Sequence, residues 1–183
     1  EGEVSFSNFL KRYISIGYKN IFKDKIDGCV FIDPKSTMNK PYLVKGEKPE
    51  RLKTLDEIPS PYLNGMLDNF FDGRLTPFIE TNRGCPFKCS FCHTGNDYFQ
   101  KINMFSTDRV KDEIDYIAKK ISGVGVSNLH IADTNFGMYP RDREVTLALS
   151  ESNKKYKWPL HIMSTTGKNN KHRVIEITDI LGS

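Results

Sequence analysis

Features that would place a chain in a membrane or outside the cell are missing from this sequence. It has no apolar run long enough to cross a bilayer and does not open with a cationic segment followed by an apolar one, so we expect no membrane partner. The net charge of +4 is small, and lysines are mixed with acidic residues, which argues against nucleic acid binding. Only four cysteines occur in 183 residues, and three of them stand close together, a usage that fits a reducing, cytoplasmic location.

Those three cysteines are the most informative feature of the chain. Cys85, Cys89 and Cys92 fall within eight residues, and an aromatic residue, Phe91, precedes the last of them. Three thiolates at this spacing can hold a cubane iron–sulfur cluster by three of its irons. The fourth iron then has no protein ligand, and an open metal position is where a small molecule can coordinate and react.

Other readings of the cysteines remain open from the residues alone. A structural zinc site needs four ligands, and the nearest candidate for the fourth, His93, is sterically awkward because it directly follows Cys92. A zinc-stabilised domain or an electron-transfer iron–sulfur protein is therefore the alternative to an enzyme. The remaining cysteine, Cys29, lies in an apolar run that ends at Ile32, so we expect it to pack in the core of a strand.

The first 73 residues show mixed local signals. Apolar spacing, prolines and turn residues predict a helix over 4–16, a strand over 29–32, a hairpin partner at 42–44, an extended linker over 46–61, and a helix from the Ser60 cap to Gly73. The linker contains three prolines and many charges, and Pro61 stands at the first position of the expected helix.

The rest of the chain repeats a strand followed by a helix. Strands are expected at 75–81, 129–132 and 160–163, and helices from Ser106 or Thr107 to 121, over 141–155 and over 171–181. This alternation indicates an α/β fold with a parallel sheet. Three units cannot close a barrel, so we expect an open sheet or the first half of one.

Polar loops follow the three expected strands. The cysteine loop leaves the first strand, the segment 133–137 leaves the second, and the segment 164–168 leaves the third. Because the carboxyl ends of parallel strands meet at one edge, these loops are expected on one rim, where such folds place their chemistry. Asp133 and Ser164 are therefore candidate binding residues, although both are also ordinary turn residues.

Two stretches of the chain carry a resemblance to a known family. Residues 55–62 contain the pattern D-x-I-P-x-P, and residues 81–92 contain T-x-R-G-C-P-x-x-C-x-F-C. Together they resemble the cobalamin-binding branch of the radical S-adenosylmethionine superfamily, over most of residues 50–140. The resemblance implies a 4Fe-4S cluster on the three cysteines, with the amino and carboxylate groups of S-adenosylmethionine on the fourth iron.

The resemblance also implies roles for residues around the cluster. Phe91 would pack near the adenine, and the backbone at His93 would meet the adenine edge. Where the family often has Gly-Gly-Glu after the second strand, this chain has Asp133, which would hold the amino group of S-adenosylmethionine. The implied chemistry is formation of a 5′-deoxyadenosyl radical and, in this branch, usually methyl transfer to an unactivated centre; other members carry out ring formation or rearrangement. The implied partners are a small-molecule substrate and a one-electron donor such as flavodoxin or ferredoxin.

The same resemblance implies a division of the chain. Residues 1–35 would be the tail of a cobalamin-binding Rossmann-like domain, residues 36–74 a linker and connecting helix, and residues 75–183 the N-terminal half of a partial parallel (β/α) barrel. The motif D-x-H-x-x-G, which ligates cobalt in that family, is absent from the sequence. The sequence opens without methionine and ends just after an amphipathic segment, so we expect a piece of a longer protein that is inactive alone.

Overall fold

The computed structural model describes residues 2–182 and divides into two compact units, one ending at Lys53 and the other beginning at Thr54. The first unit contains a helix and a small antiparallel hairpin. Its elements are α1 (Gly2–Ile16), β1 (Val30–Ile32) and β2 (Leu43–Lys45). The helix and the hairpin that the sequence predicts are both confirmed. None of the helices in the described part of the chain is long and apolar enough to cross a membrane.

Cys29 differs from its expectation. It stands directly before β1 and is half-buried, whereas the sequence predicts a strand-core residue. The cause is local: the backbone N–H of Cys29 donates to the carbonyl of Ile26 at 3.0 Å, which closes a turn before the ladder with β2 begins. Its sulfur lies 3.9 Å from the carbonyl oxygen of Ser5.

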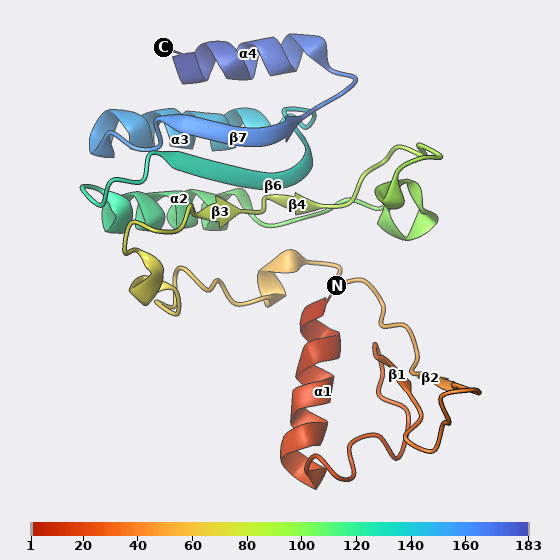
Figure 1. The fold of residues 1–183 in the computed structure, drawn as a ribbon. Helices are drawn as coiled ribbons and strands as arrows, with labels where there is room; N and C mark the ends of the chain where they lie inside the picture. The colour runs from red at the N-terminus through yellow and green to blue at the C-terminus, as the bar shows by residue number, and fades with distance from the viewer. Residues whose placement is uncertain (1, 183) are drawn as a thin grey trace. The chain divides into compact units, whose positions relative to one another are not determined.

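The second unit is a three-stranded parallel sheet with helices packed against it (Figure 1). Its sheet has the order β3-β6-β7, with β3 (Phe78–Ile79), β6 (Asn128–Phe136) and β7 (His161–Thr166). Its α-helices are α2 (Thr107–Ile121), α3 (Asp142–Tyr156) and α4 (Lys171–Gly182). Helices α2 and α3 lie side by side on one face of the sheet, and α4 packs against α3. The predicted open parallel sheet is confirmed.

The core of this unit lies between the sheet and those helices. Apolar residues recur on one stripe of α2, and Val110, Ile114 and Ile117 are buried there. Leu129 and Ile131 are the corresponding buried positions of β6, alternating with exposed ones as a strand with one covered face requires. The predicted cap is present, because the Ser106 hydroxyl accepts from the backbone N–H of Arg109 at 3.3 Å.

Two predicted elements have different extents in the structure. The helix expected up to Gly73 is a series of turns with one short 3-10 helix, Asp68–Phe70, because Gly65 takes a positive φ of 74° that interrupts helical geometry. The predicted cap at Ser60 is nonetheless present, since its hydroxyl accepts from the N–H of Leu63 at 3.1 Å. The first strand is limited to β3, shorter than the expected 75–81.

The second and third strands are longer than predicted. Two candidate residues that were expected in loops therefore lie within strands. Strand β6 continues through Phe136, so Asp133 lies on an irregular part of the strand and not in a loop after it. Strand β7 continues through Thr166, so Ser164 also lies within a strand, opposite Ile131 of β6. Both strands extend because their pairing resumes at Phe136 and Thr166 after a register shift.

A second, antiparallel ladder was not predicted. Strand β4 (Asn82–Arg83) pairs with β5 (Asn103–Met104). The cysteine loop connects these two strands, so the pairing of β4 with β5 holds its two ends next to each other.

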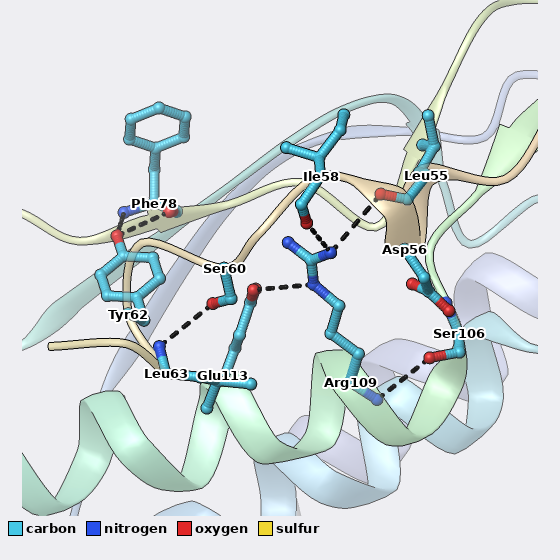
Figure 2. Close-up of polar contacts among 10 residues, drawn as sticks. All are labelled: Leu55, Asp56, Ile58, Ser60, Tyr62, Leu63, Phe78, Ser106, Arg109 and Glu113. Carbon is cyan, nitrogen blue, oxygen red and sulfur yellow. Dashed lines mark hydrogen bonds and ion pairs between the residues drawn. The ribbon is translucent and has the colours of Figure 1, made fainter. Parts of the chain in front are cut away.

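The segment that carries the D-x-I-P-x-P pattern is attached to the start of α2 (Figure 2). Asp56 accepts a hydrogen bond from the backbone N–H of Ser106 at 2.9 Å. Arg109 donates to the carbonyl oxygens of Leu55 and Ile58, and its Nε lies 3.2 Å from a carboxylate oxygen of Glu113. Because the Arg109 and Glu113 side chains are only 13% and 8% exposed, this ion pair is largely shielded from water.

A buried carboxylate joins β6 to the residues around β4. Asp133, 2% exposed, accepts from the backbone N–H of Thr81 at 2.7 Å and from the side-chain amide of Asn82 at 2.7 Å. The Thr81 hydroxyl and the backbone N–H of Asn82 also donate hydrogen bonds to the Asp133 carboxylate. Burial nevertheless raises the pKa of Asp133 to about 6, because loss of hydration outweighs the hydrogen bonds from Thr81 and Asn82.

The raised pKa of Asp133 predicts a pH dependence of stability. Between about pH 4 and pH 6 the folded state keeps this proton while the unfolded state releases it, so the free energy of unfolding falls as pH rises and levels off above pH 6. Relative to Asp133→Asn, which does not titrate, the protein should lose on the order of 3 kcal/mol across this window. Denaturant unfolding of both proteins at pH 4, 5 and 7 measures the difference, and a constant difference would contradict the assignment.

The shielded ion pair on α2 predicts a second effect. Arg109→Met leaves the Glu113 carboxylate buried without its partner, and should lower the free energy of unfolding by about 3–5 kcal/mol. The double variant Arg109→Met, Glu113→Leu should recover a large part of this loss, because no lone charge remains. Lys119→Met, which breaks an exposed pair with Asp115, is the control and should cost less than about 1 kcal/mol. Equal losses in the single and double variants would show that the pairing is unimportant.

Candidate functional site

The cysteine loop is folded by short-range backbone hydrogen bonds. The N–H of Cys85 donates to the carbonyl of Phe99 at 2.8 Å, which draws the two ends of the loop together beside the ladder of β4 and β5. The N–H of Cys92 donates to the carbonyl of Cys89, and the N–H of Gly95 donates to that of Cys92, both at 3.0 Å. These consecutive turns keep the three cysteines on one compact segment.

Two glycines make this compact path possible. Gly84, directly before Cys85, has a φ of 122°, and a Cβ there would lie 2.6 Å from the carbonyl oxygens of Phe99 and Lys101. A Cβ on Gly95 would lie 2.3 Å from the carbonyl oxygen of Cys89. Real side chains do not tolerate such distances, so the loop can close in this way only with glycine at both positions.

The three sulfurs have different surroundings. Cys85 is buried, with 4% of its surface exposed, whereas Cys89 and Cys92 are half-buried. The Cys92 sulfur lies 3.1 Å from the Thr94 hydroxyl, and this hydrogen bond lowers the pKa of the Cys92 thiol. A lower pKa favours the thiolate, which is the form that binds metal.

The end of β6 is joined to the start of the loop by two residues that the sequence analysis did not single out. The Thr134 hydroxyl donates to the carbonyl oxygen of Gly84 at 2.7 Å. The side-chain amide nitrogen of Asn135 lies 3.3 Å from the sulfur of Cys85. The only sequence signal for them was their place after a predicted parallel strand, which Asp133 shares.

The predicted binding residues lie in different settings. Phe91 is 92% exposed, so its ring is free to contact a ligand. His93 begins a 3-10 helix, His93–Gly95, and its ring lies 5.3 Å from that of Phe99. Asp133 is the buried carboxylate described above, and all four of its acceptor positions have donors from Thr81 and Asn82.

Ser164 is placed away from the rim on which the sequence analysis expected it. It is half-buried on β7, in register with Ile131, and registered neighbours in a sheet point to the same face. Ile131 belongs to the face that packs against the helices, so Ser164 shares that face. Its role in binding stays a prediction.

The residues of the loop fit the requirements of an iron–sulfur cluster. Among residues 2–182, no three histidine, cysteine or acidic side chains converge as ligands of one ion. A cubane does not require such convergence, because each of its three cysteines binds a separate iron. The donor set itself, three cysteine thiols with a lowered pKa at Cys92 and an amide beside Cys85, has the chemistry that iron–sulfur clusters need.

Solved structures with a similar fold were found. The chain superposes on the cobalamin-dependent S-adenosylmethionine radical enzyme OxsB, determined with aqua-cobalamin bound, with a TM-score of 0.56. The match covers 98% of this chain and 25% of that one at 18% identity, which supports a shared fold. No protein-family model matches the sequence.

Curated relatives give a closer match. The cobalamin-dependent radical SAM methyltransferase TokK of Streptomyces tokunonensis is 37% identical over 141 residues. The 2-(S-pantetheinyl)-carbapenam-3-carboxylate methyltransferase of Streptantibioticus cattleyicolor is 36% identical over 141 residues. Each alignment covers 74% of this chain and 20% of the relative, so the chain spans about a fifth of the length of these proteins. By this identity the chain is a homologue of cobalamin-dependent radical S-adenosylmethionine methyltransferases, in agreement with the resemblance of its cysteine loop.

Proposed function

We propose that Cys85, Cys89 and Cys92 bind a 4Fe-4S cluster in a cobalamin-dependent radical S-adenosylmethionine methyltransferase. The observation that carries the proposal is the loop between β4 and β5, which presents three thiols on one compact segment at the edge of a parallel sheet. That edge is where open α/β folds bind their ligands. Relatives whose names state methyl transfer support the reaction type.

The cluster would supply the electron that cleaves S-adenosylmethionine to methionine and a 5′-deoxyadenosyl radical, and the protein's part is to hold and orient the participants. Thr94 favours the thiolate of Cys92, and Asn135 places an N–H beside Cys85. The exposed ring of Phe91 offers a surface for the adenine, and the backbone at His93 offers polar groups for its edge. Cobalamin would be held by residues outside this chain.

The substrate class is a small molecule with an unactivated carbon or phosphorus centre. A one-electron donor such as flavodoxin or ferredoxin would reduce the cluster. Residues 75–183 would contribute the first β/α units of a barrel, and residues 1–35 the end of a cobalamin-binding domain. The parallel order β3-β6-β7 supports the first of these assignments, because adjacent parallel strands are what such a barrel is built from.

Cysteine substitutions test the cluster. After anaerobic reconstitution, the protein should contain about four irons, and Cys89→Ala should lose the oxygen-labile cluster. Cys29→Ala is the matched control and should keep it, because Cys29 belongs to the other unit and follows a turn at Ile26. Bound iron, sulfide and zinc are measured in each protein. One zinc per chain with no iron, or equal loss of iron from both variants, would reject the proposal.

A second test addresses Asp133, which we propose holds the amino group of S-adenosylmethionine through its negative charge. Asp133→Asn should weaken binding by roughly 1–3 kcal/mol, because the negative charge that attracts the amino group is lost while the acceptor positions stay occupied by Thr81 and Asn82. The control is Asp142→Asn, because Asp142 is a buried carboxylate whose hydrogen bonds go to the N–H groups of Gly137 and Tyr139. Equilibrium dialysis with the reconstituted protein at pH 7.5 gives the two dissociation constants. An unchanged constant in Asp133→Asn would leave this carboxylate with a structural role only.

A further inference from the structure

The side chain of Asn135 is buried beside a proposed cluster ligand. It is 1% exposed, and its amide nitrogen lies 3.3 Å from the Cys85 sulfur and 3.1 Å from the Thr134 hydroxyl oxygen. Its carbonyl oxygen, also buried, has no hydrogen-bond partner among the described residues. A buried acceptor without a partner destabilises the folded state by about 1–3 kcal/mol. A polar side chain at this position therefore calls for an explanation other than stability.

The neighbouring hydrogen bonds determine which way the amide points. The Thr134 hydroxyl gives its only proton to the carbonyl oxygen of Gly84 at 2.7 Å, so toward Asn135 the Thr134 oxygen can only accept. The group of Asn135 that faces Thr134 must therefore be the NH₂. Its second N–H is then directed at the sulfur of Cys85, and the reversed orientation would set two acceptor oxygens against each other.

We propose that Asn135 is a positioning residue that donates a hydrogen bond to the Cys85 thiolate and raises the reduction potential of the cluster. This inference rests on the proposed function. Reduction adds negative charge to the cluster and its sulfurs, and an N–H dipole aimed at one sulfur stabilises the more negative state. The effect is strongest where water is excluded, and Cys85 is the buried cysteine of the three.

The proposal also explains why the donor belongs to β6. Cys85 lies too deep for water to solvate its sulfur, whereas Cys89 and Cys92 are partly accessible. The N–H of Asn135 takes the place of a solvating water at Cys85. Because Thr134 holds Gly84 in place, the cysteine that follows is kept at a fixed distance from the amide.

The test is a redox titration of the reconstituted full-length natural protein, in which electron paramagnetic resonance measures the reduced cluster. Asn135→Leu removes the donor at similar side-chain size, and Asn135→Asp keeps the shape but has only acceptors. At the midpoint potential of the parent, the ratio of reduced to oxidised cluster should fall about tenfold in Asn135→Leu, which is 59 mV for a one-electron couple. The fall should be larger in Asn135→Asp, because a second negative charge stands beside the thiolate.

Asn103→Leu is the matched control. Asn103 is also buried beside the loop, on β5, and its amide nitrogen has no partner among the described residues. Its replacement should change the ratio by less than about twofold, as expected for a change in packing alone. Iron content distinguishes failure of the proposed function from failure of the role of Asn135. A parent protein without a cluster rejects both. Normal iron in every variant, with potentials equal to the parent or to Asn103→Leu, overturns only the role of Asn135.

Discussion

The hydrogen bonds that Asp133 accepts from Thr81 and Asn82 hold the site together. β3 ends at Ile79 and the cysteine loop begins at Gly84, so the few residues between them decide where the loop starts. Asp133 binds two of those residues through their backbone N–H groups and side chains. Thr134 and Asn135 continue the same connection to Gly84 and Cys85. One irregular stretch of β6 therefore fixes both the start of the loop and the surroundings of its first sulfur.

This arrangement depends on a break in regular strand geometry. In an even ladder, consecutive residues point to opposite faces, and three neighbours could not all reach the adjacent segment. The register shift between Ile131 and Phe136 removes that constraint, because β6 contains more residues than β7 over the same length. The arrangement buries the Asp133 carboxylate, and the loss of hydration raises its pKa. The four hydrogen-bond donors offset this rise in part. A strained or polar feature inside a sheet is often found next to a functional site for this reason.

Sequence reasoning identified what depends on local pattern. The spacing of the cysteines, the Ser106 cap of α2 and the hairpin of the first unit are each set by a few neighbouring residues. It missed what depends on distant partners. The strand ends at Phe136 and Thr166 follow from pairing across the sheet, so Ser164 was expected in a loop. The β4–β5 ladder joins residues about twenty apart, and no period in either segment indicates it. Asn135 carries no signal of its own, because its importance comes from the sulfur of a residue fifty positions earlier.

The second unit contains the polar framework of the cysteine loop but leaves one face of its sheet uncovered. Phe78, His130 and Met163 stand in register on neighbouring strands, and all three are exposed. Exposed apolar side chains on one face of a sheet, here Phe78 and Met163, often mark a surface that contacts a ligand or another part of a protein. The helices cover the opposite face, so this row is the face of the sheet that is open to a ligand or to further chain. The loop is therefore fixed from within the unit by hydrogen bonds and glycines, whereas Phe78, His130 and Met163 on the open face are exposed.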